Sequence, residues 1–389
     1  MKILNCLVIF LLILSAETLH ADRPAEKVRG LWVVRHNLNR PESIDSMLAF
    51  AARYHFTDLF VQVRGRGDAY YRSNYEPPAE GLEEGFDPLA YLLAKAKAAD
   101  YSLRIHAWVN VFYLWSSPVL PKSPQHLVHR RPEWIVYPVH YNPEIPDTNF
   151  SGRRNEEGLY LSPMIPEVQQ YILEVVEDLL SRYRVDGLHL DYIRFPGYDF
   201  DFNPVVRTSF KEKYFLDPLD FKRDAAVFVA NFGNTGYDIF FNRWAKFLRS
   251  GLSGFVKSLS GQLRSRYPGI IISAAVKPDL SKAYWQYYQE WDRWLREKWL
   301  DWALPMNYTP ANPEFLGRTE TILKSGDPGG ILMGISLYNQ PPESVIYKTR
   351  VITNLDLSGF VYFSYDQIAR DKKLQRLYAN KILKPEKKP

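Results

Sequence analysis

Short apolar segments alternate with longer amphipathic segments along almost the whole chain, and no other feature of the sequence constrains the fold as strongly. Strands that alternate with helices form parallel βαβ units, and eight such units close into a (β/α)8 barrel. We expect the strands at residues 30–36, 57–65, 102–110, 186–193, 269–276, 302–308, 330–338 and 359–366. We expect the helices near residues 42–55, 87–100, 166–184, 239–266, 286–299, 313–325, 342–356 and 367–380.

An open, doubly wound sheet is the alternative to a barrel. The chain contains no G-x-G-x-x-G or P-loop segment that would favour the nucleotide-binding form of that fold. No linker rich in Pro, Gly or Ser divides the chain, so we predict a single barrel domain over residues 22–389.

The first 21 residues have the pattern of an export signal. Lys2 precedes an apolar run at residues 7–14, and a polar stretch follows that ends at Ala21. A charged start, a short apolar core and a small residue before the cut are typical of a signal peptide, and the run is too short for a stable membrane anchor. We predict cleavage after Ala21, or alternatively near Ala16, and a periplasmic, extracellular or cell-wall-associated protein that is not integral to the membrane once processed. A buried N-terminal strand or helix is the other interpretation.

The composition excludes several classes of protein. Hydrophobic residues make up 46% of the chain and charged residues 24%, as in globular proteins. A single Cys allows neither a disulfide framework nor a Cys-rich zinc module. The formal charge of +5 is spread along the chain, so we expect no nucleic-acid partner. The unusual content is aromatic, with 10 Trp, 26 Tyr and 22 Phe.

Two of the expected loops are long and rich in aromatic residues. Residues 111–165 follow the third strand and residues 194–238 follow the fourth. In a barrel, the loops after the strands build the active site, and long loops usually form lids or binding walls. Aromatic rings suit sugars, whose C–H faces lie flat on them. The loops therefore favour an extended polymer groove, and the alternative is a satellite core beneath them.

Period-two alternation places polar side chains inside the barrel. The predicted inward residues are Phe60, Gln62 and Arg64, then Arg104, His106, Trp108 and Asn110, and then His189, Asp191 and Ile193. Polar side chains inside a barrel are costly unless they are paired, so their convergence near one rim indicates a site. A hydrogen-bonded structural network is the alternative.

Asp191 is the predicted catalytic carboxyl, because it ends the fourth strand, faces inward and lies close to Arg194 in the sequence. An enclosed Asp is either held ionised by Arg or kept protonated by desolvation. Glycosidic cleavage generally takes two carboxyls, as acid and as nucleophile or base. The candidates for the second carboxyl are Glu290 and Asp68, ranked ahead of Asp279 and Asp366. The substrate's own acetamido group is the other option.

Further polar and aromatic residues are predicted to bind the substrate or position the carboxyls. They are Arg64, His106, Trp108, Asn110, His189, Arg194, Asn307, Tyr308, Tyr338, Tyr365 and Asp366. No H-E-x-x-H occurs and no H-x-H opens the first strand, so we expect neither a metal nor a cofactor. No G-x-S-x-G elbow indicates an esterase.

Six segments resemble the glycosyl hydrolase-like 10 family. They are RGLW at 29–32, VQVRGRGDA at 61–69, IHAWVN at 105–110, RPEW at 131–134, DGLHLDYIRFP at 186–196 and LPMNY at 304–308. The resemblance implies a (β/α)8 barrel in exported bacterial proteins. Its best-understood members cleave peptidoglycan glycan strands stripped of stem peptides, near the division site.

A more distant resemblance is to family 18 chitinases. Their fourth strand reads D-G-x-D-x-D-x-E; Asp191 matches the last Asp of that motif, and Ile193 takes the place of the catalytic Glu. Met306 and Tyr308 resemble a pair that helps to hold an N-acetyl group in those enzymes.

Together these features predict an exported, endo-acting glycoside hydrolase of an amino-sugar polymer, with peptidoglycan glycan as the expected substrate and division-site protein partners compatible with it. Two alternatives stay open. The first is a non-catalytic glycan-binding barrel, because Ile193 stands where the family 18 chitinases have their catalytic Glu. The second is a hydrolase of an α-linked polysaccharide, which would have no pocket for an acetamido group.

Overall fold

The computed structural model describes residues 27–99, 101–142, 144–145, 147–325 and 327–384, and the predicted signal peptide lies outside them. A single eight-stranded parallel sheet forms the centre of the molecule. Its strands are β1 (Val28–Val33), β2 (Asp58–Arg64), β3 (Arg104–Asn110), β6 (Gly187–Asp191), β7 (Ile271–Val276), β8 (Trp302–Pro305), β9 (Leu332–Ser336) and β10 (Gly359–Phe363). The order β8-β7-β6-β3-β2-β1-β10-β9, with parallel bridges from Ala303 to Ile331 and from Met306 to Gly334, brings its two ends together as a barrel. The predicted (β/α)8 fold is confirmed.

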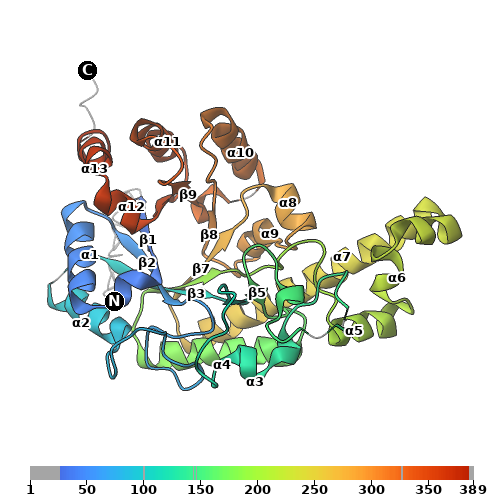
Figure 1. Cartoon of the computed structure of the whole chain (residues 1–389). Coiled ribbons are helices and arrows are strands. Elements are labelled where there is room, and N and C mark those ends of the chain that lie inside the picture. The colour runs from blue at the N-terminus through green and yellow to red at the C-terminus, as the bar shows by residue number, and fades with distance from the viewer. Residues whose placement is uncertain (1–26, 100, 143, 146, 326, 385–389) are drawn as a thin grey trace, which may run out of the picture.

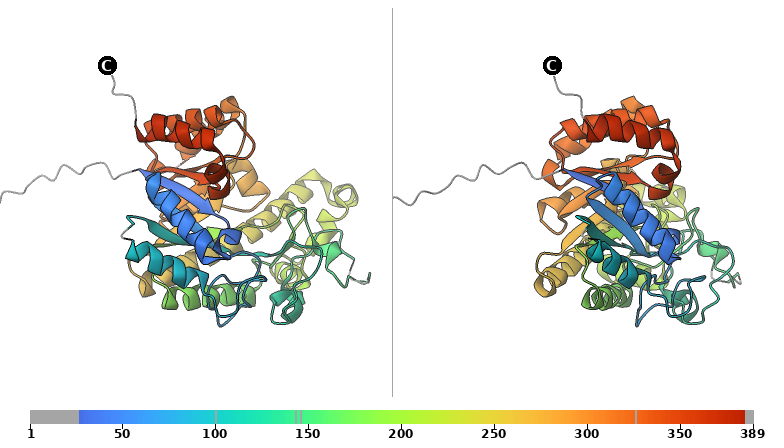
Figure 2. Two further views of the ribbon diagram at one scale, coloured as in Figure 1. Left: turned by 60° about the vertical axis from the view of Figure 1, so that its left-hand side comes forward. Right: turned by 90° about the vertical axis from the view of Figure 1, so that its left-hand side faces the viewer.

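Helices surround the sheet (Figures 1 and 2). The principal ones are α1 (Pro41–Arg53), α2 (Pro88–Ala98), α4 (Pro166–Arg182), α7 (Ala225–Arg266), α9 (Trp291–Arg296), α10 (Asn312–Ser325), α11 (Pro342–Asn354) and α13 (Lys372–Tyr378). The other α-helices are α3 (Leu127–Arg130), α5 (Pro204–Tyr214), α6 (Pro218–Lys222), α8 (Leu280–Trp285) and α12 (Tyr365–Arg370). Many begin with proline, whose fixed φ suits the first helical turn. No helix among the described residues has both the length and the apolar character that crossing a membrane would require.

Side chains of the strands divide into an outer and an inner core, as the alternation predicts. The outer core, under the helices, includes Leu59, Val61, Val63, Ile105, Ala107, Val109, Leu188 and Leu190. The inner core contains Val28, Trp32, Phe60, Trp108, Leu304, Leu332 and Val361.

The prediction that Ile193 faces inward is wrong. Ile193 is completely buried in the outer core. The alternation ends at Tyr192, whose φ of 51° lies in the left-handed region, so the residues beyond it no longer follow the strand's parity.

The two long loops contain structure of their own. The loop after β3 includes β4 (Tyr113–Trp115) and β5 (Leu159–Tyr160), which pair as an antiparallel ribbon. After β6, the chain forms α5, α6 and the first part of α7, which project beyond the barrel as an arm over residues 204–241 (Figure 1). Trp115, Tyr160, Phe200 and Phe202 are buried, so these loops do form a satellite core, whereas Tyr198 and Phe215 are exposed.

A fully buried ion pair joins β2 to the loop that follows it. The Arg64 guanidinium donates from Nε to Glu76 Oε1 at 2.8 Å and from Nη2 to the same oxygen at 2.6 Å. Both side chains are 0% exposed. The register of β2 against β3 shifts between Gln62 and Arg64, which places Arg64 in this pair and away from the pocket described below.

Glu76→Ala is therefore expected to destabilise the protein by about 3–5 kcal/mol, because it leaves Arg64 buried without its charge partner. Chemical denaturation of both proteins measures the difference. The matched control is Glu320→Ala, which removes a carboxylate paired with Lys324 at 2.7 Å between side chains that are 67% and 73% exposed. We expect no measurable change in the control, because exposed ion pairs contribute little. Equal stability of the Glu76 variant and the wild type would contradict this account.

Candidate active site

A pocket of about 830 Å³ opens at the carboxyl ends of the barrel strands. Asn110, Asp191 and Phe363, the last residues of β3, β6 and β10, all line it. Because parallel strands end at the same rim, residues far apart in the sequence meet there. The acidic side chains of the lining are Glu157, Asp191, Asp279 and Glu314, and the basic ones are Arg35, Arg194, Lys277, Lys282 and Arg318.

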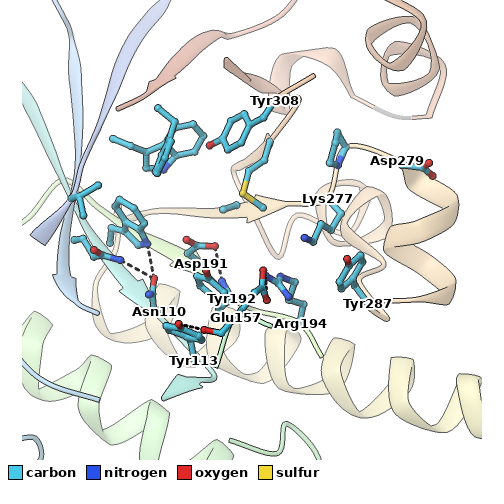
Figure 3. A pocket seen from close by; sticks show the side chains of 18 of the residues that line it. Asn110, Tyr113, Glu157, Asp191, Tyr192, Arg194, Lys277, Asp279, Tyr287 and Tyr308 are labelled. Carbon is cyan, nitrogen blue, oxygen red and sulfur yellow. Dashed lines mark hydrogen bonds and ion pairs between the residues drawn. The ribbon is translucent and has the colours of Figure 1, made fainter. Parts of the chain in front are cut away.

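Asp191 is an enclosed carboxyl in the wall of this pocket (Figure 3). Its residue is 7% exposed, and the backbone N–H of Tyr192 donates to Oδ1 at 2.7 Å. Burial raises the pKa of Asp191 to about 6, although the Tyr192 N–H and the charge of Arg194 oppose the shift. Asp191 is therefore protonated in mildly acidic solution, in which an exposed Asp would be ionised.

Glu157 is a second pocket carboxyl, and its environment has the opposite effect. Arg194 Nη2 donates to its two oxygens at 2.9 and 3.0 Å, and the Tyr160 hydroxyl donates to Oε2. Burial alone would raise the pKa of Glu157, but Arg194, Tyr160 and Lys277 outweigh it and lower the pKa below its usual value. The charge of Glu157 in turn raises the pKa of Asp191, so the two carboxyls lie within electrostatic reach of one another.

A tight turn before β5 holds Glu157 in place. Asn155 Oδ1 accepts hydrogen bonds from the backbone N–H groups of Glu157 and Gly158, both at 2.9 Å. Gly158 has a φ of 138°, and a Cβ there would lie 2.3 Å from the carbonyl oxygen of Trp115. Only glycine fits this close approach, so the Asn-x-x-Gly turn fixes where Glu157 enters the pocket.

Arg194 and Lys277 are the two cations whose charges act on both of these carboxyls (Figure 3). The Arg194 guanidinium carbon lies 4.7 Å from the ring centroid of Tyr192 and 5.2 Å from that of Tyr287. Lys277 Nζ lies 4.2 Å from the Tyr287 ring centroid. Burial and the neighbouring Arg194 lower the pKa of Lys277 to about 8, so its amine stays mostly charged at neutral pH.

Aromatic rings and amides form the floor of the pocket. Tyr308 and Phe363 stack with centroids 5.5 Å apart, and Trp32 meets each of them edge-on at 6.2 Å. Trp108 Nε1 donates to Asn110 Oδ1 at 2.8 Å, and Asn110 Nδ2 donates to the Gly65 carbonyl at 2.8 Å. Because the Trp108 indole and the Asn110 amide bond one another and the backbone, this side of the floor is held in place before a ligand arrives.

Seven residues predicted from the sequence as candidate carboxyls or substrate-binding residues line the pocket. They are Trp108, Asn110, Asp191, Arg194, Asp279, Tyr308 and Tyr338, and Asp279 is the candidate that was ranked below Glu290 and Asp68. Eight predicted residues do not line it: Arg64, Asp68, His106, His189, Glu290, Asn307, Tyr365 and Asp366.

The two candidates ranked first for the second carboxyl have structural roles instead. Glu290 precedes α9, and its Oε2 accepts a hydrogen bond from Ser253 Oγ of α7 at 2.8 Å, within the helical layer. Asp68 is 3% exposed and accepts the backbone N–H of Arg66 at 2.8 Å, so it closes a turn after β2. The structure corrects this ranking: the carboxyl that shares the pocket with Asp191 and carries an opposite pKa shift is Glu157.

His106 and His189 lie inside the barrel but not in the pocket lining. His106 bonds Asp58 at 2.8 Å near the amino ends of β2 and β3, opposite the pocket. His189 accepts from Trp32 Nε1 at 3.0 Å and contacts Ser273 Oγ at 3.0 Å, so it holds the floor from below. Burial lowers the pKa of His189 well below its usual value, which keeps it neutral.

The side chains of the remaining three predicted residues also form hydrogen bonds or ring contacts with other residues of the protein. Asn307 donates to the Phe315 carbonyl at 3.1 Å, and Tyr365 packs edge-on against Phe50 at 5.5 Å. Asp366 accepts from Asn37 Nδ2 and bonds His36 Nε2, both at 3.0 Å. Strand parity predicted that these residues face inward or end a strand. It could not show that their side chains already contact other residues of the protein.

Several pocket residues were missed because they lie in irregular chain. Glu157, Tyr113 and Tyr287 belong to loops or short strands with no periodic pattern. The Asn155–Gly158 turn was a usable signal, since it marks a fixed loop position next to two adjacent acids. Within the described residues, no three His, Cys, Asp or Glu side chains come together as a metal site.

Comparisons with known proteins agree with this architecture. The model described as Glycosyl hydrolase-like 10 matches residues 27–338. The glycosyl hydrolase DigH of Escherichia coli K12 is 25% identical over 332 residues, which cover 74% of this chain and 67% of that protein. The glycosyl hydrolase YngK of Bacillus subtilis is 26% identical over 189 residues, which cover 46% of this chain but only 32% of that protein.

Two solved structures are similar in fold. The glycoside hydrolase domain of PgaB (BpsB) from Bordetella bronchiseptica superposes with a TM-score of 0.64 at 14% identity, covering 90% of this chain and 98% of that domain. The catalytic domain of a beta-amylase from Paenibacillus polymyxa gives a TM-score of 0.61 at 15% identity, covering 92% and 98%. At these identities the likeness concerns the fold alone.

Proposed function

Because this chain belongs to the glycosyl hydrolase-like 10 family, we propose that it is an exported, endo-acting glycoside hydrolase of peptidoglycan glycan strands that lack stem peptides. One observation carries the proposal: two carboxyls of one pocket have opposite pKa shifts, with Asp191 raised to about 6 and Glu157 lowered. Such a pair supplies a proton donor and an ionised partner at the same pH, as glycosidic cleavage requires.

Asp191 is the proton donor in this mechanism. The Tyr192 N–H occupies Oδ1, so Oδ2 carries the proton and delivers it to the glycosidic oxygen. The bond between that oxygen and the anomeric carbon then breaks, and the leaving sugar departs as an alcohol. Ionised Glu157 stabilises the positive charge that develops at the anomeric carbon and accepts a proton from the water that attacks it. Arg194 positions Glu157 and keeps it charged.

Charge and shape of the pocket support an acidic amino-sugar polymer as substrate. The floor of Trp32, Tyr308 and Phe363 offers flat apolar faces to sugar rings. A glycan strand without stem peptides carries one free carboxylate on each muramic acid. Lys277 and Lys282 line the pocket, and among the described residues neither amine has a carboxylate oxygen within ion-pair distance. These two amines are available to pair with substrate carboxylates.

Digestion of isolated sacculi tests this function. We expect the protein to release glycan fragments of mixed length from amidase-stripped sacculi and little from intact sacculi, as measured by product mass. Release of only terminal units would replace the endo-acting mode by an exo-acting one. Binding of sacculi without any release would indicate a glycan-binding protein, and cleavage of a neutral α-linked polysaccharide alone would indicate another substrate class.

Export is a separate part of the proposal and rests on the predicted signal peptide. We expect N-terminal sequencing of the protein recovered from the periplasm or the medium to begin at Asp22. A start near residue 17 would move the cleavage site to Ala16. Recovery of the protein with residues 1–21 intact in the cytoplasm would contradict export.

A further inference from the structure

We propose that a row of aromatic side chains outside the pocket binds the part of a long glycan strand that extends beyond the catalytic carboxyls. The row consists of Trp285 from α8 and of Phe241 and Tyr237 from α7. The inference rests on the proposed function, because its occupant is a continuation of the same polymer. None of the three residues was predicted to bind sugar from the sequence.

The row begins at the rim of the pocket. Asp279 and Lys282, at the start of α8, line the pocket, and so does Tyr287 just after this helix. Lys282 and Trp285 are three residues apart on a helix, so their side chains are neighbours on one face. A strand that leaves the pocket past Lys282 therefore reaches Trp285 next.

The three rings of the row are nearly parallel and are offset from one another. The centroids of Trp285 and Phe241 are 6.4 Å apart with an interplanar angle of 23°, and those of Phe241 and Tyr237 are 6.0 Å apart at 21°. At these separations near-parallel rings are offset, so neighbouring rings do not cover one another's faces completely. Phe241 and Tyr237 lie one helical turn apart on α7. This part of α7 belongs to the arm that projects beyond the barrel, so the row runs away from the barrel (Figure 1).

Trp285 is fixed on its inner side and open to solvent on the other. The Arg249 guanidinium carbon lies 4.8 Å from its ring centroid, and Tyr284 packs edge-on at 4.9 Å and 78°. Arg249 is 4% exposed, whereas Trp285 is 41% exposed, so the cation lies on the buried side of the indole. A ring that is already held in place loses little conformational entropy when a sugar stacks on it.

A cation accompanies the row. Lys222 Nζ lies 5.2 Å from the Phe241 ring centroid and 5.4 Å from that of Tyr198, which is itself 50% exposed. Flat apolar faces with a nearby amine suit a polymer that combines sugar rings with carboxylates. The row therefore offers the same chemistry as the pocket, continued along the arm.

Binding measured without turnover tests the row. The experiment uses the full protein carrying Asp191→Asn and compares amidase-stripped glycan strands of two lengths, a single disaccharide and long strands, by titration calorimetry. We expect Trp285→Ala to weaken binding of long strands about tenfold and to leave binding of the disaccharide unchanged. Trp285→Phe should restore most of the lost affinity. The matched control is Tyr347→Ala, which removes a 44% exposed ring from α11, away from the row, and should change neither affinity.

The outcomes separate this inference from the proposed function. If the Trp285→Ala variant binds long strands with wild-type affinity, the row does not bind the glycan strand and the inference is contradicted. An equal loss for both lengths would also overturn it, because that result would place Trp285 in the pocket or in the folding of the protein. Failure of the parent Asp191→Asn protein to bind either glycan would contradict the proposed function itself, as would binding only of neutral polysaccharide.

Discussion

Replacement of Asp191 by Asn is expected to lower the rate of glycan release at least about a thousandfold, because the amide cannot donate the proton that the leaving sugar requires. The oxygen of the new amide would still accept the hydrogen bond from the Tyr192 N–H, so the local geometry should persist. Comparison of product release by the two proteins on amidase-stripped sacculi measures the loss. Equal release would mean that another carboxyl is the acid.

The same substitution should stabilise the protein above pH 6. The pKa of Asp191 rises from 3.8 to about 6 on folding, so ionisation of this buried carboxyl destabilises the folded state as the pH rises through that interval. The amide of the Asp191→Asn variant cannot ionise and avoids this cost, which corresponds to about 3 kcal/mol at most above pH 6 and vanishes below pH 3.8. Denaturation at pH 8 and at pH 3.5 distinguishes the two regimes.

Asp201 provides a matched control for both effects. It is fully buried, burial raises its pKa to about 6, and it does not line the pocket. Asp201→Asn should therefore resemble Asp191→Asn in stability but retain activity on sacculi. Loss of activity in both variants would indicate that the Asp191 result reflects general damage to the fold.

Glu157→Gln is expected to lower the rate about a hundredfold and to move the pH profile. In the wild type, activity should fall as the pH rises through about 6, where Asp191 loses its proton. The charge of Glu157 raises the pKa of Asp191, so removing it should shift this basic limb to lower pH. Rates measured from pH 4 to pH 8 on stripped sacculi give both quantities.

The control for this variant is Glu314→Gln, which changes another carboxyl of the pocket lining. Glu314 accepts from Thr309 Oγ1 and pairs with Arg318, and its side chain is 49% exposed. We expect a small change in rate and an unshifted basic limb. If the basic limb shifts in the control but not in the Glu157 variant, Glu157 is not the carboxylate whose charge raises the pKa of Asp191.

The sequence predicted the positions that regular strands determine. Three such positions line the pocket: Trp108 and Asn110 on β3, and Asp191 on β6. They could be predicted because the alternation of side chains and the end of a strand follow from the order of residues. His106 and His189 satisfy the same parity and face the interior, but they lie at depths below the pocket. Parity specifies the face of a strand, while depth along the barrel depends on how the strands are staggered.

Irregular segments limited the prediction of the site. Glu157 enters the pocket only because the Asn155–Gly158 turn and the β4–β5 ribbon fold over the barrel mouth. Glu290 resembled a candidate by its place in the sequence, yet Ser253 of α7 holds it in the helical layer. Such contacts join residues that are far apart in the chain, so no local pattern reports them.

By itself, the sequence predicted the barrel, its eight strands along the chain and the inward position of Asp191 at the end of one of them, because residue alternation is a local property of the chain. Only the tertiary structure decided which carboxyl accompanies Asp191, which histidines are structural and where an aromatic row continues from the pocket. The physical reason is that charge, burial and stacking depend on distances between distant segments, and folding alone sets those distances.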